Sequence, residues 1–248
     1  MDLDRYVKKL TACKFLQLFI IAQMNQRDSL AYLSKFVRDE KDLHTQVEMG
    51  AISTSQLSRK QGMLSTGGFG EVFQYLVAEI RIRMKQTPFI HNYKQLHVID
   101  SSTMPMSLSQ YPWATFKKMK AGVRLHMKIV VTKELIVPNK AVLLPAKHTN
   151  RTQMDELITI DSGALSLFDR GYLFDQYSFE NVQFITWLKD KAKIEVLTEQ
   201  EPNLENLIFQ DAEVYLGSEV NGTKTQNTFR LYKLNLSFTL LLIPHMLV

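Results

Sequence analysis

The chain has one cysteine, Cys13, among its 248 residues. An intramolecular disulfide is therefore excluded, and no cluster of Cys and His residues indicates a zinc site. Cys13 lies in an apolar helical pattern, so we expect a packed thiol. No apolar run reaches the roughly 20 residues of a membrane-spanning helix, and the first residues do not form a signal peptide. These absences favour a cytoplasmic protein with no membrane partner.

Charge and hydrophobic content are moderate. The formal net charge is +5, and 45% of the residues are hydrophobic, which is enough to build a core. The length suggests one large domain or two small ones. A mild basic excess fits a polyanion such as nucleic acid, although many cytoplasmic proteins carry as much.

Residues 1–88 follow a helical pattern of apolar positions. Ser53 is suited to cap a short helix that would present Gln56, Arg59 and Lys60 outward. This segment resembles the second helix of a helix-turn-helix, which would contact DNA. A solvated helix with ordinary surface charges is the alternative.

A glycine-rich stretch follows at 65–72, with the sequence STGGFGEV. It looks like the phosphate-binding loop of a protein kinase, but the kinase lysine, catalytic-loop and Asp-Phe-Gly motifs do not occur in the sequence. Apolar residues here recur at helical spacing. We therefore interpret Gly67 and Gly68 as a loop before a helix that runs to about residue 84.

Two short apolar stretches each end in an aspartate. Residues 96–99 precede Asp100, and residues 165–168 precede Asp169. Both stretches predict buried strands that present a carboxylate at the tip. If the strands are neighbours in one sheet, the carboxylates can share divalent metal, because hard cations select carboxylate oxygens. Alternatively, each Asp starts a turn after its strand.

The densest basic segment lies between these aspartates. Alternation in residues 123–129 predicts a half-buried strand with a polar face that includes His126, which we expect at the surface or beside the backbone. We interpret the basic side chains as contacts to a DNA phosphate backbone, with a solvated strand face as the alternative. The expected contacts are Lys117, Lys118, Lys120, Arg124 and Lys128.

The order of the predicted elements suggests a fold. A loop is expected after Asp100, because Pro105 and Pro112 follow it. A strand within 134–145 and a helix near 154–158 precede the Asp169 strand. The series strand, strand, strand, helix, strand predicts a mixed sheet in which a crossover brings the two acidic tips together, as in a ribonuclease H-like core.

Four motifs resemble bacterial insertion-sequence transposases of the DDE class. They are VIDSS at 98–102, KAGVRLH at 120–126, AKHT at 146–149 and LFDRGY at 167–172. The resemblance covers roughly residues 5–233 and belongs to the branch with a Tyr-x2-Arg-x3-Glu-x6-Lys signature. It implies a ribonuclease H-like fold and strand transfer on double-stranded DNA, at terminal inverted repeats and target DNA.

The resemblance also implies site residues and a cellular setting. Asp100 and Asp169 would be catalytic and would hold two Mg²⁺ (or Mn²⁺) ions, while Arg170 and Tyr172 match supporting positions beside them. The protein would be bacterial and nucleoid-associated, and a complete enzyme could form a homodimer.

We therefore expect an α+β or α/β chain in four segments. A helical DNA-end-binding region occupies 1–88, and a partial ribonuclease H-like core occupies 89–190. The first part of a β-rich insertion occupies 191–233, and an atypical apolar tail occupies 234–248.

The family signature with the third acidic residue does not occur in the sequence, whose last glutamate is Glu219. We interpret the tail as frameshifted and the chain as a C-terminally truncated transposase with little strand-transfer activity; a final buried strand is the plain alternative. Two other functions stay open. One is a DNA-binding regulator of the full-length enzyme, and the other is a metal-dependent nuclease that recruits Glu180 or Glu195.

Overall fold

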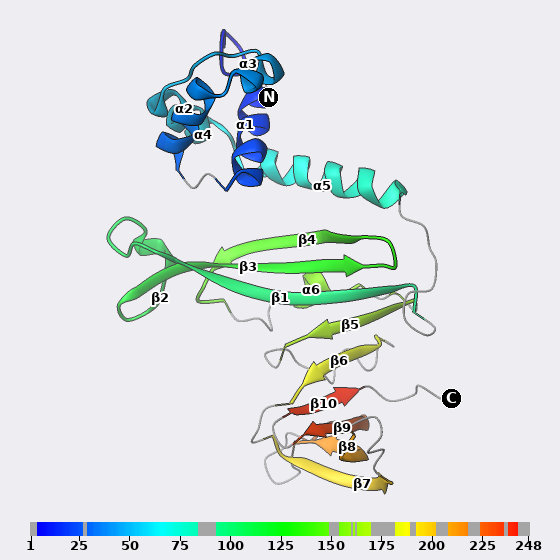
Figure 1. Cartoon of the computed structure of the whole chain (residues 1–248). Coiled ribbons are helices and arrows are strands. Elements are labelled where there is room, and N and C mark those ends of the chain that lie inside the picture. Colours follow the sequence, from blue (N-terminus) through cyan, green and yellow to red (C-terminus); the bar gives the residue numbers. More distant parts are fainter. Residues whose placement is uncertain are drawn as a thin grey trace. The chain divides into compact units, whose positions relative to one another are not determined.

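The computed structural model separates the chain into two compact units, residues 1–76 and residues 77–248 (Figure 1). Each unit is considered by itself. The structure describes residues 4–26, 29–83, 93–148, 154–159, 161, 163–169, 182–188, 192–201, 208–217, 224–235 and 238–242.

The first unit is helical. Its helices are α1 (Ala12–Met24), α2 (Leu30–Asp39), α3 (Lys41–Val47), α4 (Thr54–Met63) and the start of α5 (Thr66–Arg83), which crosses into the second unit. Phe15, Leu18, Val37 and Leu57 form the centre of its core, and each is fully buried. Amphipathic helices of this length gain most of their stability from such packing rather than from intrinsic propensity.

Side-chain caps fix where these helices begin. The predicted cap at Ser53 is confirmed, because its hydroxyl accepts a hydrogen bond from the backbone N–H of Gln56 at 3.2 Å. The Gln56 side chain in turn accepts from the Ser53 N–H at 3.1 Å, which completes a capping box. Such a cap is worth about 1 kcal/mol.

Two local expectations are wrong in this unit. Gly67 and Gly68 lie in the first turn of α5 and not in a loop before it, because the Ser65 hydroxyl accepts from the Gly68 N–H at 3.1 Å and so starts the helix earlier. Cys13 is exposed and not packed, because Phe15 and Leu18 take the buried positions of α1.

The second unit is a mixed sheet of ten strands, in agreement with the expected α+β class. The strands are β1 (Gln95–Met106), β2 (Thr115–Lys117), β3 (Lys120–Val131), β4 (Ile136–Pro145), β5 (Ala164–Phe168), β6 (Phe184–Trp187), β7 (Ile194–Gln200), β8 (Gln210–Leu216), β9 (Phe229–Asn235) and β10 (Phe238–Leu242). A 3₁₀ turn (Pro112–Ala114) and the short helix α6 (Met154–Leu157) complete the described elements of this unit.

Figure 1 shows the strand order β2-β3-β1-β5-β6-β10-β9-β8-β7, with β4 beside β3. Strand β1 runs antiparallel to β3 and parallel to β5, and β5 runs parallel to β6. The pairings of β10, β9, β8 and β7 are antiparallel. Parallel neighbours align their carboxyl ends at one edge, which is where ligands commonly bind in such sheets.

One face of the sheet packs into a core with α6. Ile99, Phe168 and Phe184 meet Leu157 of α6 there, and Phe229 extends the core to β9. The Phe168 and Phe184 rings lie 4.9 Å apart between centroids. This packing fixes β1, β5 and β6 against one another.

The face of β3 that was expected at the surface lies inside. His126 is 0% exposed and Lys128 is 4% exposed, so the expectation of a surface position for His126 is wrong. The register explains the reversal, because Lys128 pairs with Ile99 and both then share the face covered by α6. The apolar face of β3, with Leu125, is only half-buried.

Strand β1 does not stop at Asp100, as expected, but continues to Met106. Residues 101–106 pair with residues 121–126 of β3, beyond the point where β5 ends. We call this two-stranded extension, with residues 107–120 between its strands, the arm. Pro105 is tolerated because only β3 borders the strand there, and an edge position loses no further hydrogen bond. The six residues from Ser101 to Met106 span about 20 Å.

The apolar tail contributes a strand. Residues 238–242 form β10, which pairs with β6 on one side and β9 on the other. The alternative of a final strand thus agrees with the described part of the tail. Within the described residues, no helix is both long enough and apolar enough to cross a membrane.

Candidate metal and nucleic-acid site

Asp100 and Asp169 lie side by side at the edge where β5 ends. The last register pair of the parallel strands β1 and β5 is Ile99 with Phe168, and the two aspartates are the next residues along each strand. Adjacent strands lie about 4.8 Å apart, and successive side chains alternate between faces. Both carboxylates therefore leave the sheet on the face opposite the buried Ile99 and Phe168, and both are exposed.

The backbone helps to orient one carboxylate. The N–H of Ser101 donates to Asp100 Oδ1 at 2.6 Å. Among the described residues, neither Asp100 nor Asp169 forms a salt bridge with a Lys or Arg side chain. Mg²⁺ is commonly held by one or two carboxylates with water and phosphate oxygens completing the shell, so these donors fit a hard divalent cation.

A third carboxylate does not join this pair in the described part of the chain, where no group of three or more Asp, Glu, His or Cys residues is suited to a metal. Glu195 lies on β7, five strand positions from β5, and its carboxylate pairs with Lys224 at 2.9 Å. It is therefore not the missing acid. Glu180, Arg170 and Tyr172 lie outside the described residues.

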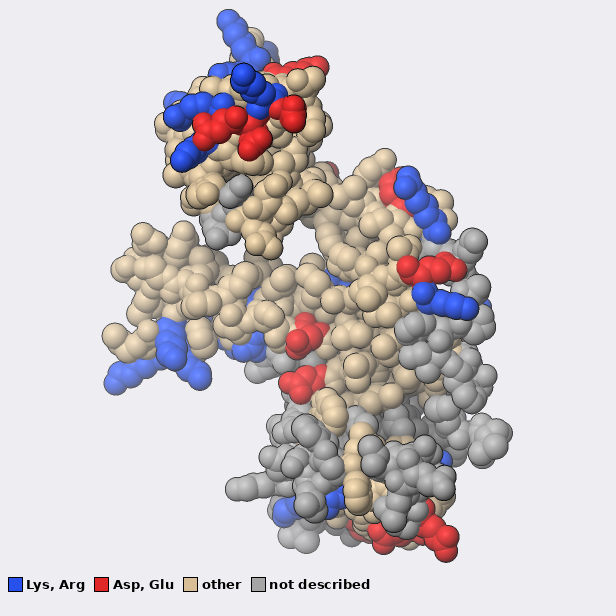
Figure 2. Space-filling view, in the orientation of Figure 1, with Lys and Arg blue, Asp and Glu red and all other residues tan. Residues whose placement is uncertain are grey.

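Exposed lysines gather on the arm. Lys117, Lys118 and Lys120, which we call the arm lysines, are all exposed on the β2–β3 hairpin. Figure 2 shows blue Lys and Arg side chains at the outer end of the sheet and red acidic side chains nearer its middle. The arm begins at the residue after Asp100, so it connects the exposed arm lysines to the carboxylate pair.

Two of the basic residues expected at DNA have other contacts. Arg124 donates from Nε to Thr103 Oγ1 at 3.2 Å and from a terminal nitrogen to the His148 carbonyl at 3.3 Å. It thus ties the arm to the turn after β4. Lys128 is 4% exposed and donates to the hydroxyl of Thr159, so its ammonium does not reach the surface.

Of the three α4 side chains expected to point outward, two are exposed and one is buried. Gln56 and Arg59 are exposed, as expected for a helix that could contact DNA. Lys60 is 4% exposed and forms an ion pair of 2.7 Å with Asp4, which lowers the pKa of that carboxyl. The hydrogen bond from Lys60 is the largest cause. A lysine held in this way stabilises the unit rather than extending toward phosphate.

Buried ionisable groups lie behind the carboxylate pair, on the covered face of the sheet. His97 is 4% exposed, and burial lowers its pKa to about 4, with nearby Lys128 adding to the effect. Burial likewise lowers the pKa of Lys128 to about 8, followed by repulsion from Lys140 and Arg81. These shifts favour neutral side chains inside the core. His97 and Lys128 therefore lie in the core beneath the sheet and not at the edge that carries the two aspartates.

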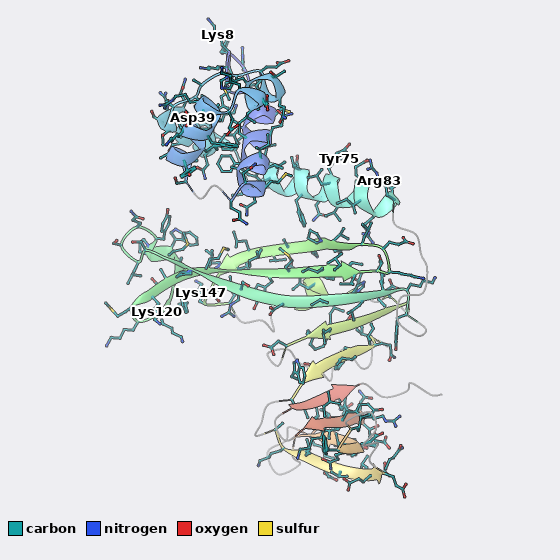
Figure 3. All side chains as sticks on the ribbon, viewed as in Figure 1. Lys8, Asp39, Tyr75, Arg83, Lys120 and Lys147 are labelled. Carbon is teal, nitrogen blue, oxygen red and sulfur yellow. The ribbon has the colours of Figure 1, made fainter. Side chains whose placement is uncertain are left out.

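One exposed lysine beside the arm was missed by sequence reasoning. Lys147 follows β4, and the backbone N–H of the preceding Ala146 donates to the Gly122 carbonyl at 2.9 Å. Figure 3 labels Lys120 and Lys147 near one another on this part of the sheet. Lys147 belongs to the AKHT motif at 146–149, but the motif assigned it no role and does not specify a neighbour.

No family model matches the chain, and no curated protein matches it. Among solved structures, the chain is similar to endonuclease V from Bacillus subtilis, with 14% sequence identity. The alignment covers 70% of this chain and 75% of that chain, with a TM-score of 0.31. A similarity of this size carries no argument about fold or function, so both depend on the geometry described above.

Proposed function

We propose that this chain is a DNA-processing protein of the DDE transposase type, with its phosphoryl-transfer site at Asp100 and Asp169. The observation that carries the proposal is their position as the next residues after the last register pair of two adjacent parallel strands. Two exposed carboxylates on one face of adjacent strands are suited to share a divalent cation, because such ions are held by carboxylate oxygens.

The strand arrangement supports a ribonuclease H-like core. Strands β4, β3 and β1 run antiparallel in that order, and β5 and β6 then continue parallel to β1. In chain order this is three antiparallel strands followed by two parallel ones, with the first strand in the middle. This order places Asp100, within β1, beside Asp169, the residue that follows the end of β5.

The residues have separate roles in this proposal. Asp100 and Asp169 would hold Mg²⁺ or Mn²⁺, which when bound supplies positive charge at the scissile phosphate. The arm lysines would bind the phosphate backbone and align it along the arm toward the carboxylates. Gln56 and Arg59 on α4 would contact the end of the element. The DNA substrate would carry terminal inverted repeats.

The salt dependence of DNA binding tests the arm. In the double variant Lys117→Ala with Lys118→Ala, two phosphate contacts are lost, so the slope of log affinity against log salt should fall in magnitude by about 2. The charge-matched control is Lys133→Ala with Lys193→Ala, two exposed lysines away from the arm. Fluorescence anisotropy with a labelled duplex measures both. Equal slopes in the two variants would contradict the proposed path of the DNA.

A second function is favoured by one observation, namely that the described residues hold two carboxylates at the site and not three. A DDE site normally neutralises two divalent cations with three acids, so we expect weak or undetectable strand transfer from this chain. The chain would then act as a DNA-binding regulator that occupies the terminal repeats. Specific binding without cleavage in Mg²⁺ or Mn²⁺ supports this function, whereas robust excision that Asp100→Asn abolishes supports the transposase.

A further inference from the structure

The tip of the arm carries two exposed aromatic rings that the proposed function does not yet use. Trp113 is 59% exposed and Tyr111 is 39% exposed. Their ring centroids lie 6.5 Å apart with the planes at 90°, which is a favourable edge-to-face contact. An exposed Trp or Tyr side chain can offer its ring face to a ligand while its polar group stays in water.

The tip is an ordered platform. The Tyr111 N–H donates to the Ser107 carbonyl at 2.9 Å, and the Thr115 hydroxyl donates to the Pro112 carbonyl at 2.7 Å. Ala114, in the turn between the two rings and β2, is 0% exposed. The backbone of the tip is therefore held from both sides of the aromatic pair.

Close packing at the base of the tip requires a glycine. A Cβ on Gly122 would lie 2.8 Å from the Met104 carbonyl oxygen and 3.3 Å from the Phe116 ring. The strands approach this closely only because Gly122 has no side chain. A segment that is packed internally but leaves Trp113 in solvent is suited to present that ring to a ligand.

The charge around the rings identifies the class of ligand. The three arm lysines follow the aromatic pair within a few residues and are all exposed. An aromatic face beside a row of ammonium groups is the combination that binds unpaired nucleic-acid bases, because the ring stacks on the base and the cations hold the backbone. This combination favours nucleic acid over a protein partner at the tip.

We propose that Trp113, supported by Tyr111, stacks on an unpaired base of the DNA that the arm lysines hold. The substrate class is thereby narrowed to DNA with an opened or frayed end, rather than a fully paired duplex. The inference rests on the proposed function, because the arm leads from this tip to Asp100. Stacking at the tip would hold the end open and fix which phosphate reaches the carboxylates.

Intrinsic fluorescence tests the stacking directly. The chain has two tryptophans, and Trp187→Phe leaves Trp113 as the sole indole. We expect the emission of Trp113 to be quenched on addition of a duplex with a short unpaired end, and much less by the same duplex with a blunt end. Anisotropy of the labelled DNA in the same cuvette reports binding independently.

The affinity of variants gives the second measurement. Trp113→Ala should weaken binding to the unpaired-end duplex by about five- to 150-fold, the range for one stacked base, and leave blunt-duplex affinity nearly unchanged. Trp113→Phe should retain most of the preference because it keeps an aromatic face. Met119→Ala is the matched control, because Met119 is 78% exposed on the same tip and has no aromatic face.

The outcomes separate the two proposals. If both duplexes bind without quenching Trp113, the stacking proposal is overturned while DNA binding stands. If neither duplex binds, both proposals fail. If Trp113→Ala lowers the affinity for paired and unpaired ends equally, the stacking proposal is also overturned. It is overturned as well if sedimentation without DNA shows a dimer that dissociates in Trp113→Ala but not in Met119→Ala.

Discussion

The helical unit satisfies its buried polar groups, whereas the sheet unit leaves several without a partner among the described residues. In the helical unit, the Ser34 hydroxyl donates to the Ile52 carbonyl at 2.6 Å, and Lys60 pairs with Asp4. In the sheet unit, both ring nitrogens of His126 and Nδ1 of His97 are buried without a hydrogen-bond partner among the described residues. Each such group costs about 1–3 kcal/mol.

The buried side-chain atoms without a hydrogen-bond partner, among the described residues, all lie in the sheet unit. Costs of this kind are tolerated where a functional site constrains the structure. The open edge with Asp100 and Asp169 lies in the unit that carries these costs. Under the proposed function, the sheet unit would carry the chemistry and the helical unit would contribute to binding.

Truncating a buried core side chain should destabilise one unit without the other, and this is the largest change in stability that we expect. Phe15→Ala removes a fully buried ring that stacks 4.4 Å from Phe19, and Phe184→Ala removes one that meets Phe168 and Phe229. Each should lower the free energy of unfolding of its own unit by about 3–5 kcal/mol.

Spectroscopy can distinguish the units in urea titrations. Both tryptophans lie in the sheet unit, so their fluorescence reports it, while far-UV circular dichroism is dominated by the helices. We expect Phe15→Ala to shift only the dichroism transition. A single coincident transition that both variants shift equally would show that the units do not unfold independently.

Acidification should weaken the sheet unit selectively. The pKa of His97 is about 4 in the folded chain, below its ordinary value of 6.5, so the unfolded chain binds more protons between these values. The stability of the sheet unit should therefore fall as the pH drops from about 6.5 to 4, by at most about 3 kcal/mol from this group. His126, whose pKa is also lowered by burial, adds to the loss.

The helical unit supplies the contrast in that pH window. The pKa of Asp4 is lowered from its ordinary value of 3.8, so the stability that it contributes is present above pH 3.8 and is lost only below it. Urea titrations at pH 7 and pH 5 should shift the fluorescence transition and leave the dichroism transition in place. His97→Gln should reduce the shift of the fluorescence transition between pH 7 and pH 5. An unchanged shift would show that His97 does not cause the loss of stability.

The two buried lysines should respond in opposite directions to the same substitution. Lys60→Met removes the ion-pair partner of the Asp4 carboxylate, which keeps its hydrogen bond from the Ala12 N–H, and should destabilise the helical unit by about 1 kcal/mol, a small value because Asp4 is partly exposed. Lys128→Met removes a buried ammonium that donates to the Thr159 hydroxyl, a neutral partner, and should leave the sheet unit unchanged or more stable by about 1 kcal/mol. If both substitutions lower the free energy of unfolding, the predicted difference between the two buried lysines is wrong.

Three local signals in the sequence were reliable, although the expectations for Gly67, Gly68 and Cys13 were wrong. The cap at Ser53 and the strands that lead into Asp100 and Asp169 follow from short-range patterns, and the structure has all three. The carboxylate pair could be expected because strand ends in a mixed sheet meet at one edge. Whether the pair binds metal stays a prediction.

Properties set by tertiary contacts were not readable from the sequence. Alternation in β3 identified two faces but not which one α6 covers, and this decided the burial of His126 and Lys128. Lys60 looked like a surface cation because its partner, Asp4, is 56 residues away in the chain. The arm was missed because Pro105 suggested a loop, and only the pairing with β3 extends the strand.

Binding of Mn²⁺ is the most direct test of the central claim. We would titrate Mn²⁺ into the wild-type chain, Asp100→Asn, Asp169→Asn and the control Glu134→Gln, which alters an exposed carboxylate in the β3–β4 turn. Electron paramagnetic resonance of free Mn²⁺ would give the affinity. We predict binding by the wild type and the control, and a loss of more than about 100-fold in each aspartate variant, because even an outer-shell partner contributes 10- to 100-fold. Unchanged binding in either aspartate variant, or none by the wild type, would contradict the metal site.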